Sequence, residues 1–204
     1  MNDDLINIAI ASYNKGKIKE FENIFKNTKY RAISPSELKI NIETIENGKS
    51  FEENAIIKAK SFGKISPIPT LADDSGLEID FLNKMPGIDS AIFLGTNASY
   101  KQRFEYILEK MQNVELNKRK ARFVCSIAIF NPSNNKVYTV ESCLEGIISF
   151  EAMGEGGFGY DPIFYIPEYK KTMAELNLEQ KNKISHRALA SQKVLKKLDE
   201  IFLI

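Results

Sequence analysis

Two adjacent aspartates, Asp73 and Asp74, follow a short apolar stretch and are the first candidates for chemistry. Side chains alternate along a strand, so neighbours near a strand end point into different environments. One carboxylate can then serve a ligand while the other orients a neighbouring group. A carboxylate beside a divalent metal helps to activate water for attack on phosphorus. The alternative is an ordinary Asp-Asp-Ser-Gly surface turn.

Polar and basic residues also follow the first apolar segment, in the order Ser12-x-Asn14-x-x-Lys17. A helix that begins there offers N–H groups and partial positive charge, which favour phosphate. Ser12 and Asn14 can add hydrogen bonds, and Lys17 can add a full positive charge. The spacing of a P-loop is absent. The alternative is a turn with a surface lysine.

Acidic residues gather before and at the start of a predicted helix, namely Glu43, Glu46, Glu52 and Glu53. Magnesium prefers a few carboxylates completed by phosphate oxygens and water. One of these glutamates together with Asp74 would suffice. The alternative is that they serve only as cap and dipole partners of the helix.

That predicted helix carries Asn54 and Lys58 four residues apart on one face. They either line a ligand site or face water. Ser50 and Glu53 are expected to form a capping box at the start of the helix.

A glycine-rich segment, residues 156–162, combines three glycines with Phe158, Tyr160 and Asp161. Glycines let the backbone approach a ligand closely. The two aromatic side chains offer faces on which a purine can stack, and Asp161 can accept hydrogen bonds. This composition favours a functional loop over surface filler.

The last candidate segment is Ser185-His186-Arg187. Ser185 is expected to cap a helix, which puts His186 and Arg187 in its first turn. Cations there oppose the helix dipole, so a ligand or acidic neighbour is expected to compensate. Because His186 is the only histidine, one chain cannot build a cluster of zinc-binding histidines. The alternative is a structural histidine.

The elements that must position these residues follow from apolar periodicity and turn formers. The aspartates are expected in a turn at residues 73–76, and residues 118–120 in a solvated basic step. A hairpin is expected around residues 131–135. The expected strands are 5–11, 70–72, 77–80, 122–130, 136–141 and 145–150, and the expected helices are 18–25, 51–62, 100–111 and 185–201. The mixture of crossovers and hairpins predicts an α/β fold with a mixed sheet flanked by helices.

Composition fits one domain of 204 residues, 1–204, with two lobes. The 28 basic and 27 acidic residues argue against a nonspecific nucleic-acid surface, while a small anionic ligand remains compatible. No apolar run is long enough for a membrane span. Asp3 and Asp4 stand where a secretory signal would be basic. Cys125 and Cys143 are expected to be small buried hydrophobes rather than a disulfide. A cytoplasmic protein is predicted.

The motifs occur in an order that resembles the inosine triphosphate pyrophosphatases, which remove deaminated purine nucleotides. The matching segments are S-x-N-x-x-K, S-F-E-E-N-A-x-x-K-A, A-D-D-S-G-L, P-G-x-x-S-A, G-G-F-G-Y-D-P-x-F and S-H-R. They extend from Ser12 to Arg187, which is nearly the whole chain. One departure is visible, because Ile92 stands where the family commonly has arginine after P-G-x-x-S-A.

The resemblance implies an elongated mixed α/β fold with two lobes around a central active cleft, usually a homodimer, and a requirement for Mg²⁺. It implies Asp74 as catalytic base and metal ligand, and Glu46 as second metal ligand. The implied substrate-binding residues are Ser12, Asn14, Lys17, Ser75, Phe158, Gly159, Tyr160, Asp161, Lys181, His186 and Arg187.

The predicted function is hydrolysis of the purine nucleoside triphosphates ITP, dITP and XTP to monophosphate and pyrophosphate. In this hypothesis, water attacks the α-phosphorus with the help of Mg²⁺ and Asp74. Two alternatives stay open: a related pyrophosphatase acting on modified pyrimidine nucleotides, and a nucleotide-binding module without catalysis.

Overall fold

The computed structural model describes residues 5–202, apart from the side chain of Leu178. Asp3 and Asp4, which entered the prediction of location, lie outside the described residues. The chain forms two units. The first unit comprises Met1–Asp74, Ser126–Glu141 and Ala190–Ile204, and the second comprises Ser75–Cys125 and Ser142–Leu189. Three strands and one helix run through both units.

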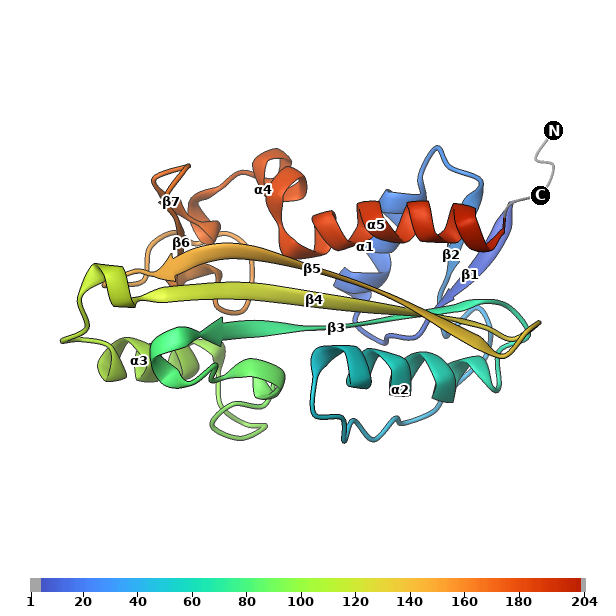
Figure 1. Cartoon of the computed structure of the whole chain (residues 1–204), viewed down its shortest axis with the longest axis horizontal. Coiled ribbons are helices and arrows are strands. Elements are labelled where there is room, and N and C mark those ends of the chain that lie inside the picture. Colours follow the sequence, from blue (N-terminus) through green and yellow to red (C-terminus); the bar gives the residue numbers. More distant parts are fainter. Residues whose placement is uncertain (1–4, 203–204) are drawn as a thin grey trace. The chain divides into compact units, whose positions relative to one another are not determined.

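The elements alternate between strands and helices over the first part of the chain and then change to hairpin connections (Figure 1). In the first unit they are β1 (Ile6–Ile10), α1 (Lys15–Phe25), β2 (Tyr30–Ile33) and α2 (Phe51–Gly63). In the second unit they are α3 (Tyr100–Lys110), β6 (Phe164–Ile166), β7 (Lys171–Thr172) and α4 (Leu178–Ile184). The elements that continue through both are β3 (Thr70–Ile79), β4 (Lys120–Asn131), β5 (Lys136–Ile148) and α5 (His186–Ile201).

The strands pair in the order β2-β1-β3-β4-β5-β6-β7. β1 is parallel to both β2 and β3, whereas β6 is antiparallel to β5 and β7. Parallel pairs need crossover connections, and α1 and α2 supply them. The predicted α/β class with a mixed sheet and flanking helices is confirmed.

In the first unit, α2 covers one face of the sheet. Ala55 and Ala59 of this helix pack against Ala72 of β3 and against Ala128 and Phe130 of β4. Small side chains let the helix approach the strands closely. In Figure 1, α2 follows one side of these strands, while α1 and the C-terminal part of α5 follow the other. Side chains that alternate along β3 therefore meet different helices.

The second unit has its own apolar core. Leu77 and Ile79 of β3 belong to it, together with Ile107 and Met111 of α3 and its end. The rings of Phe123 and Phe164 pack in a tilted arrangement, with 4.4 Å between their centroids, within the same core. This core supports the glycine-rich loop that precedes β6.

Two strand predictions are wrong. Residues 73–76 do not form a turn, because β3 continues unbroken from Thr70 to Ile79. Likewise, residues 136–141 and 145–150 are not two strands, since β5 runs from Lys136 to Ile148. In both cases polar residues within a long strand suggested an interruption that sheet pairing overrides. Strands β2, β6 and β7 and helix α4 were not predicted.

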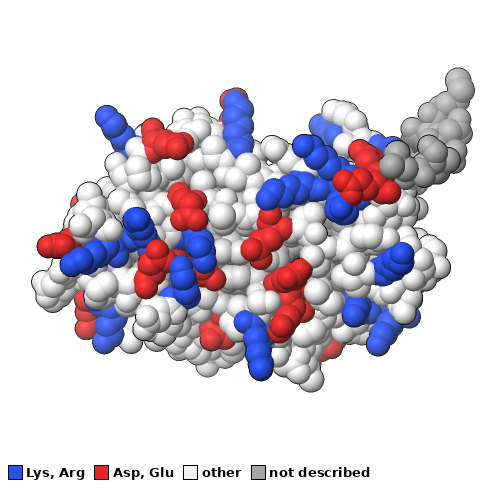
Figure 2. Space-filling view, in the orientation of Figure 1, with Lys and Arg blue, Asp and Glu red and all other residues white. Residues whose placement is uncertain are grey.

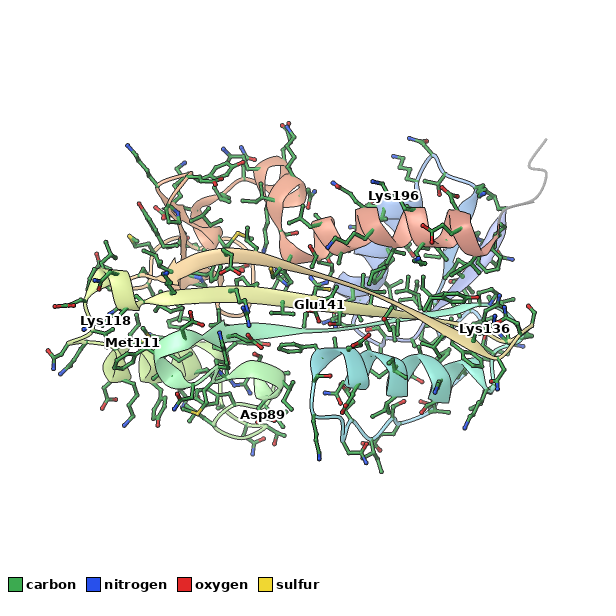
Figure 3. All side chains as sticks on the ribbon, viewed as in Figure 1. Asp89, Met111, Lys118, Lys136, Glu141 and Lys196 are labelled. Atoms are coloured by element: carbon green, nitrogen blue, oxygen red, sulfur yellow. The ribbon has the colours of Figure 1, made fainter. Side chains whose placement is uncertain are left out.

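The prediction that the basic residues 118–120 are all exposed to solvent is also wrong, because the middle residue is buried. Arg119 is fully buried, and its guanidinium donates to the carbonyls of Ile148, Ser149, Met111 and Val114 at 2.5–3.3 Å. These four acceptors satisfy a charge that burial would otherwise penalise. Burial lowers the pKa of Arg119 from its ordinary value. Figure 3 labels Met111 and Lys118, which flank this arginine in the second unit.

Charged side chains of both signs lie intermixed on the face seen in Figure 2. No helix among the described residues is long and apolar enough to cross a membrane. Cys125 is buried as expected, but Cys143 is exposed, so the expectation of burial is wrong for the second cysteine.

Candidate active site

Asp73 and Asp74 are consecutive in β3 and contact different helices. Asp73 is buried and pairs with Lys17 of α1, with 2.8 Å between Nζ and Oδ2. Asp74 instead accepts from Lys58 of α2 at 2.9 Å and from Asn54 at 3.2 Å. The predicted division of the two carboxylates between different environments is confirmed.

Lys58 brings two carboxylates to one position. Its ammonium donates to Asp74 at 2.9 Å and to Glu46 at 2.8 Å. Glu46, the acid implied by the resemblance, thus shares a cation with Asp74. Glu53 is used otherwise, because its carboxylate accepts from the backbone N–H of Lys49 at 2.6 Å. The sequence left open whether Lys58 lines a site or faces water, and its side chain is only 13% exposed.

The capping box predicted for α2 is half correct. Ser50 accepts from the N–H of Glu53 at 3.1 Å, as an N-cap does. The carboxylate of Glu53, however, reaches Lys49 instead of returning to Ser50. It therefore ties down the loop that carries Glu46.

Burial and charge act in opposite directions on this cluster. Burial raises the pKa of Asp74, and the attraction of Lys58 offsets only part of that rise. Burial lowers the pKa of Lys58, but Asp74 and Glu46 outweigh it and leave that pKa raised. Lys58 consequently remains a cation, while Asp74 takes up a proton more readily than an exposed aspartate.

The turn after β1 is organised by its own side chains. Asn14 is the N-cap of α1, and its Oδ1 accepts from the N–H groups of Gly16 and Lys17 at 2.8 and 3.3 Å. Ser12 accepts from the N–H of Asn14 at 3.2 Å. Ser12, Asn14 and Lys17 are thus held together at the start of one helix, as the motif predicts.

In the second unit, the carboxylate of Asp161 stabilises the conformation of the glycine-rich loop. This carboxylate is buried and accepts from the N–H of Phe158 at 2.9 Å and from the ammonium of Lys181. Gly157 lies at a φ of +76°, and a Cβ there would stand 2.1 Å from Oδ2 of Asp161. Gly159 also has positive φ, at +67°. Glycine is therefore required for the loop to close on this carboxylate.

Phe158 presents its ring to solvent, and two cations lie over the ring. The side chain is 56% exposed, and the ammonium of Lys181 lies 4.6 Å from the ring centroid. The guanidinium of Arg187 lies 5.8 Å from the same centroid. An exposed aromatic face with adjacent cations suits an electron-rich heterocycle linked to phosphate.

Tyr160 does not offer a second stacking face. It is 3% exposed, its hydroxyl donates to the carbonyl of Ser90 at 2.9 Å, and its ring meets Tyr100 edge-on. The expectation that Tyr160 stacks on a purine is wrong, because core packing buries its ring. Its role is to connect the loop to the P-G-x-x-S segment. Ile92, which stands at the family's arginine position, is 52% exposed.

His186 and Arg187 start α5, which Ser185 caps by accepting from Ala188 N–H at 3.1 Å. The ring of His186 stacks on Phe123 at 4.9 Å. Arg187 donates to the hydroxyl of Ser75 at 3.2 Å. Lys181, His186, Arg187 and Ser75 thus belong to the same unit as Phe158. The contact with Phe123 had no signal in the sequence beyond the apolar pattern of β4.

The described residues hold no group of three or more His, Cys, Asp or Glu side chains arranged for a metal. Glu46 and Asp74 nevertheless converge on one cation, the ammonium of Lys58. Two carboxylates fit an ion that takes its remaining ligands from phosphate and water, as Mg²⁺ does. They do not fit a closed structural site such as that of zinc.

Fold and site together define an α/β protein with a mixed sheet, a capped helix start and a carboxylate–lysine cluster on β3. Residues 8–197 match the model of the Ham1 family. The chain belongs to this family.

Curated relatives are similar over nearly their whole length. A dITP/XTP pyrophosphatase of Bacillus subtilis is 44% identical and covers 93% of this chain and 96% of its own. One from Desulforamulus reducens is 42% identical, covering 96% and 97%. The resemblance predicted from the motifs is confirmed.

Solved structures of Ham1 proteins have a similar fold. The Ham1 protein of Staphylococcus aureus has a TM-score of 0.85 at 42% identity, covering 95% of this chain and 98% of its own. A HAM1 protein from Coxiella burnetii has a TM-score of 0.88 at 38% identity, covering 96% and 99%.

Proposed function

We propose that this chain hydrolyses the non-standard purine nucleoside triphosphates ITP, dITP and XTP to monophosphate and pyrophosphate. The chain is a nucleoside triphosphate pyrophosphatase of the Ham1 family, a class in which relatives more than 40% identical are named dITP/XTP pyrophosphatases. The observation that carries the proposal is the cluster of Asp74, Glu46 and Lys58 on β3 and α2.

The residues of the first unit are proposed to hold the triphosphate. Lys17 is oriented by buried Asp73, which leaves further ammonium hydrogens for phosphate oxygens. Ser12 accepts from a backbone N–H, so its own hydrogen can be donated to phosphate. The N–H groups of Gly16 and Lys17 already bind Asn14, and a phosphate at the helix start has to share them. Positioning and charge neutralisation supply most of the catalysis.

Asp74 is proposed to orient and deprotonate the attacking water. The water oxygen forms a bond to the α-phosphorus, the bond from that phosphorus to the bridging oxygen breaks, and pyrophosphate leaves with the electron pair. The proton passes to Asp74, whose raised pKa favours its acceptance. Glu46 and Asp74 are proposed to hold Mg²⁺, which supplies charge neutralisation at the phosphates when bound.

The residues of the second unit are proposed to select the nucleoside. Phe158 provides the stacking face, and Lys181 and Arg187 flank it. Inosine and xanthosine carry a keto oxygen at purine position 6, where adenosine carries an amine. A donor from His186 or Arg187 can form a hydrogen bond to the keto oxygen, whereas the amine of adenosine would find no acceptor there. Ser75, which Arg187 contacts, directly follows Asp74 in β3.

Pyrophosphate release with Mg²⁺ tests the proposal across ITP, dITP, XTP, GTP, ATP and a modified UTP. We expect turnover of ITP, dITP and XTP far above that of ATP. Faster turnover of modified UTP would instead assign a pyrimidine substrate. Binding of ITP without release of pyrophosphate would assign a binding module.

We further propose that the enzyme acts as a homodimer in the cytoplasm on the free nucleotide pool. Sedimentation at micromolar concentration tests the first point. A species with the mass of one chain would contradict it.

A further inference from the structure

Asn54 of α2 is a buried amide that joins two parts of the active site. The side chain is 5% exposed. Its Oδ1 accepts from the backbone N–H of Gly48 at 2.9 Å, and its Nδ2 donates to Oδ2 of Asp74 at 3.2 Å. One side chain thus contacts both the loop that carries Glu46 and the carboxylate of Asp74.

The Gly48 contact decides which way the amide points. A backbone N–H can meet only the oxygen of the amide, so the nitrogen must face Asp74. Asp74 therefore receives a hydrogen bond at Oδ2 from Asn54 and at Oδ1 from Lys58, 2.9 Å away. Because each oxygen has its own donor, rotation of the carboxylate is opposed on both sides.

The loop meets the helix closely at the same point. A Cβ on Gly48 would stand 2.7 Å from Oδ1 of Asn54 and 2.9 Å from its backbone nitrogen. Only glycine allows this approach without a shift of the backbone. Glu46 lies two residues earlier, so the Gly48 bond also limits where that carboxylate can reach.

We propose that Asn54 is a positioning residue that holds Asp74 and the Glu46 loop in one arrangement for the reaction. This inference rests on the proposed pyrophosphatase function. Asn54 touches neither water nor phosphate in this role and acts through its two neighbours. Partners of this kind typically change activity by about 10- to 100-fold when they are removed.

Two substitutions separate the two contacts. Asn54→Asp has nearly the same shape and keeps an acceptor for Gly48, but it removes the donor to Asp74. Asn54→Ala removes both. We expect kcat for ITP to fall about 10- to 100-fold in each variant, with a much smaller change in KM.

The amide of Gly48 gives a readout that is independent of turnover. In hydrogen-exchange NMR of the whole chain, this amide should stay protected in Asn54→Asp and lose protection in Asn54→Ala. The matched control is Asn131→Ala, which removes another asparagine of 5% exposure that binds Ser133 in the first unit. It should lower Tm and leave kcat near that of wild type.

The outcomes are distinguishable. Wild-type turnover together with undiminished kcat in Asn54→Asp would overturn the inference and leave the proposed function standing. So would losses of kcat and Tm in Asn131→Ala equal to those in Asn54→Asp, because a general loss of packing would then explain both. Wild-type protein that releases no pyrophosphate would overturn the proposed function and this inference with it. Should Asn54→Ala fail to fold, the near-isosteric Asn54→Asp decides.

Discussion

At the scale of single residues, Asp74 has two proposed roles, as the base and as a metal ligand. Its carboxylate is 14% exposed and shares Lys58 with Glu46. An amide at this position keeps the shape, but its single oxygen can accept from only one of the two donors, Asn54 or Lys58, which now reach separate oxygens. Substitution by asparagine therefore removes the chemistry of this side chain while it keeps its shape and one of its hydrogen bonds.

We expect Asp74→Asn to lower kcat about 10²- to 10⁴-fold, the usual contribution of a general base, because an amide cannot accept the proton of water. The fold should remain intact, with a loss of stability of about 1 kcal/mol, which corresponds to one lost hydrogen bond. Pyrophosphate release and thermal unfolding measure the two effects. The control is Asp89→Asn, because Asp89 is an exposed aspartate (Figure 3). This variant should retain full turnover. Near-normal turnover of Asp74→Asn would remove this residue from its role.

Gly157 gives a second prediction at this scale. Both Gly157 and Gly95 have positive φ, but a Cβ meets Asp161 only at Gly157. Gly95→Ala should cost about 1 kcal/mol from backbone strain alone. Gly157→Ala should cost about 2–3 kcal/mol and raise KM, because Phe158 loses its support from Asp161. Urea unfolding and ITP kinetics compare the two variants. Equal costs would show that the contact with Asp161 is unimportant.

At the scale of elements, Tyr30 of β2 holds the C-terminal part of α5 within the first unit. Its hydroxyl donates to Asp199 at 2.7 Å, and Lys29 lies 3.1 Å from the same carboxylate. The hydrogen bond from Tyr30, followed by that from Lys29, lowers the pKa of Asp199. A lowered carboxylate pKa stabilises the fold above the ordinary aspartate value of about 4, and this is lost as pH falls through the lowered value.

Tyr30→Phe should therefore flatten the loss of stability on acidification below about pH 4. Wild type and variant should differ most near neutral pH and converge at low pH. Urea midpoints measured between neutral and acid pH test this, with Tyr138→Phe of β5 as control. A constant difference at every pH would show that Asp199 is not involved.

Arg119 is the corresponding anchor of the second unit. It connects the end of α3, the start of β4 and the end of β5 through four carbonyls. Arg119→Lys keeps the charge but cannot reach all of them, so we expect a loss of about 2–4 kcal/mol. Lys118→Gln, at the neighbouring position, should change stability by less than about 0.5 kcal/mol. Comparable losses in both variants would contradict the anchoring role.

The elements show where sequence reasoning succeeds. The caps Ser50 and Ser185 were predictable, because caps are local signals. Helix α1, expected over residues 18–25, begins earlier, at Lys15, because Asn14 caps it. The continuity of β3 through Asp73–Gly76 was not predictable, since polar residues in a strand are stabilised by distant partners such as Lys17. For the same reason the burial of Arg119 and Tyr160 was not predictable. Ser149, one of the acceptors of Arg119, lies 30 residues away in sequence, and Ser90, the acceptor of Tyr160, lies 70 residues away.

At the scale of the whole molecule, we expect the proposed metal to serve the reaction and not the fold. The apolar clusters of both units contain no metal ligand among the described residues. Glu46 is 42% exposed. Removing divalent ions with EDTA should abolish pyrophosphate release and leave Tm unchanged. Restored Mg²⁺ should restore turnover, and a large fall in Tm with EDTA would instead reveal a structural ion.

The alternation of Asp73 and Asp74 in β3 has a consequence for evolution and design. Sliding this strand by one residue would turn each carboxylate to the opposite face of the sheet, so that Asp74 would leave the side of Lys58 and Asp73 the side of Lys17. Strand register is thus part of the arrangement that the proposed reaction requires. A single-residue insertion between Thr70 and Asp73 should be more damaging than most point substitutions at the same positions, even where the sheet still forms.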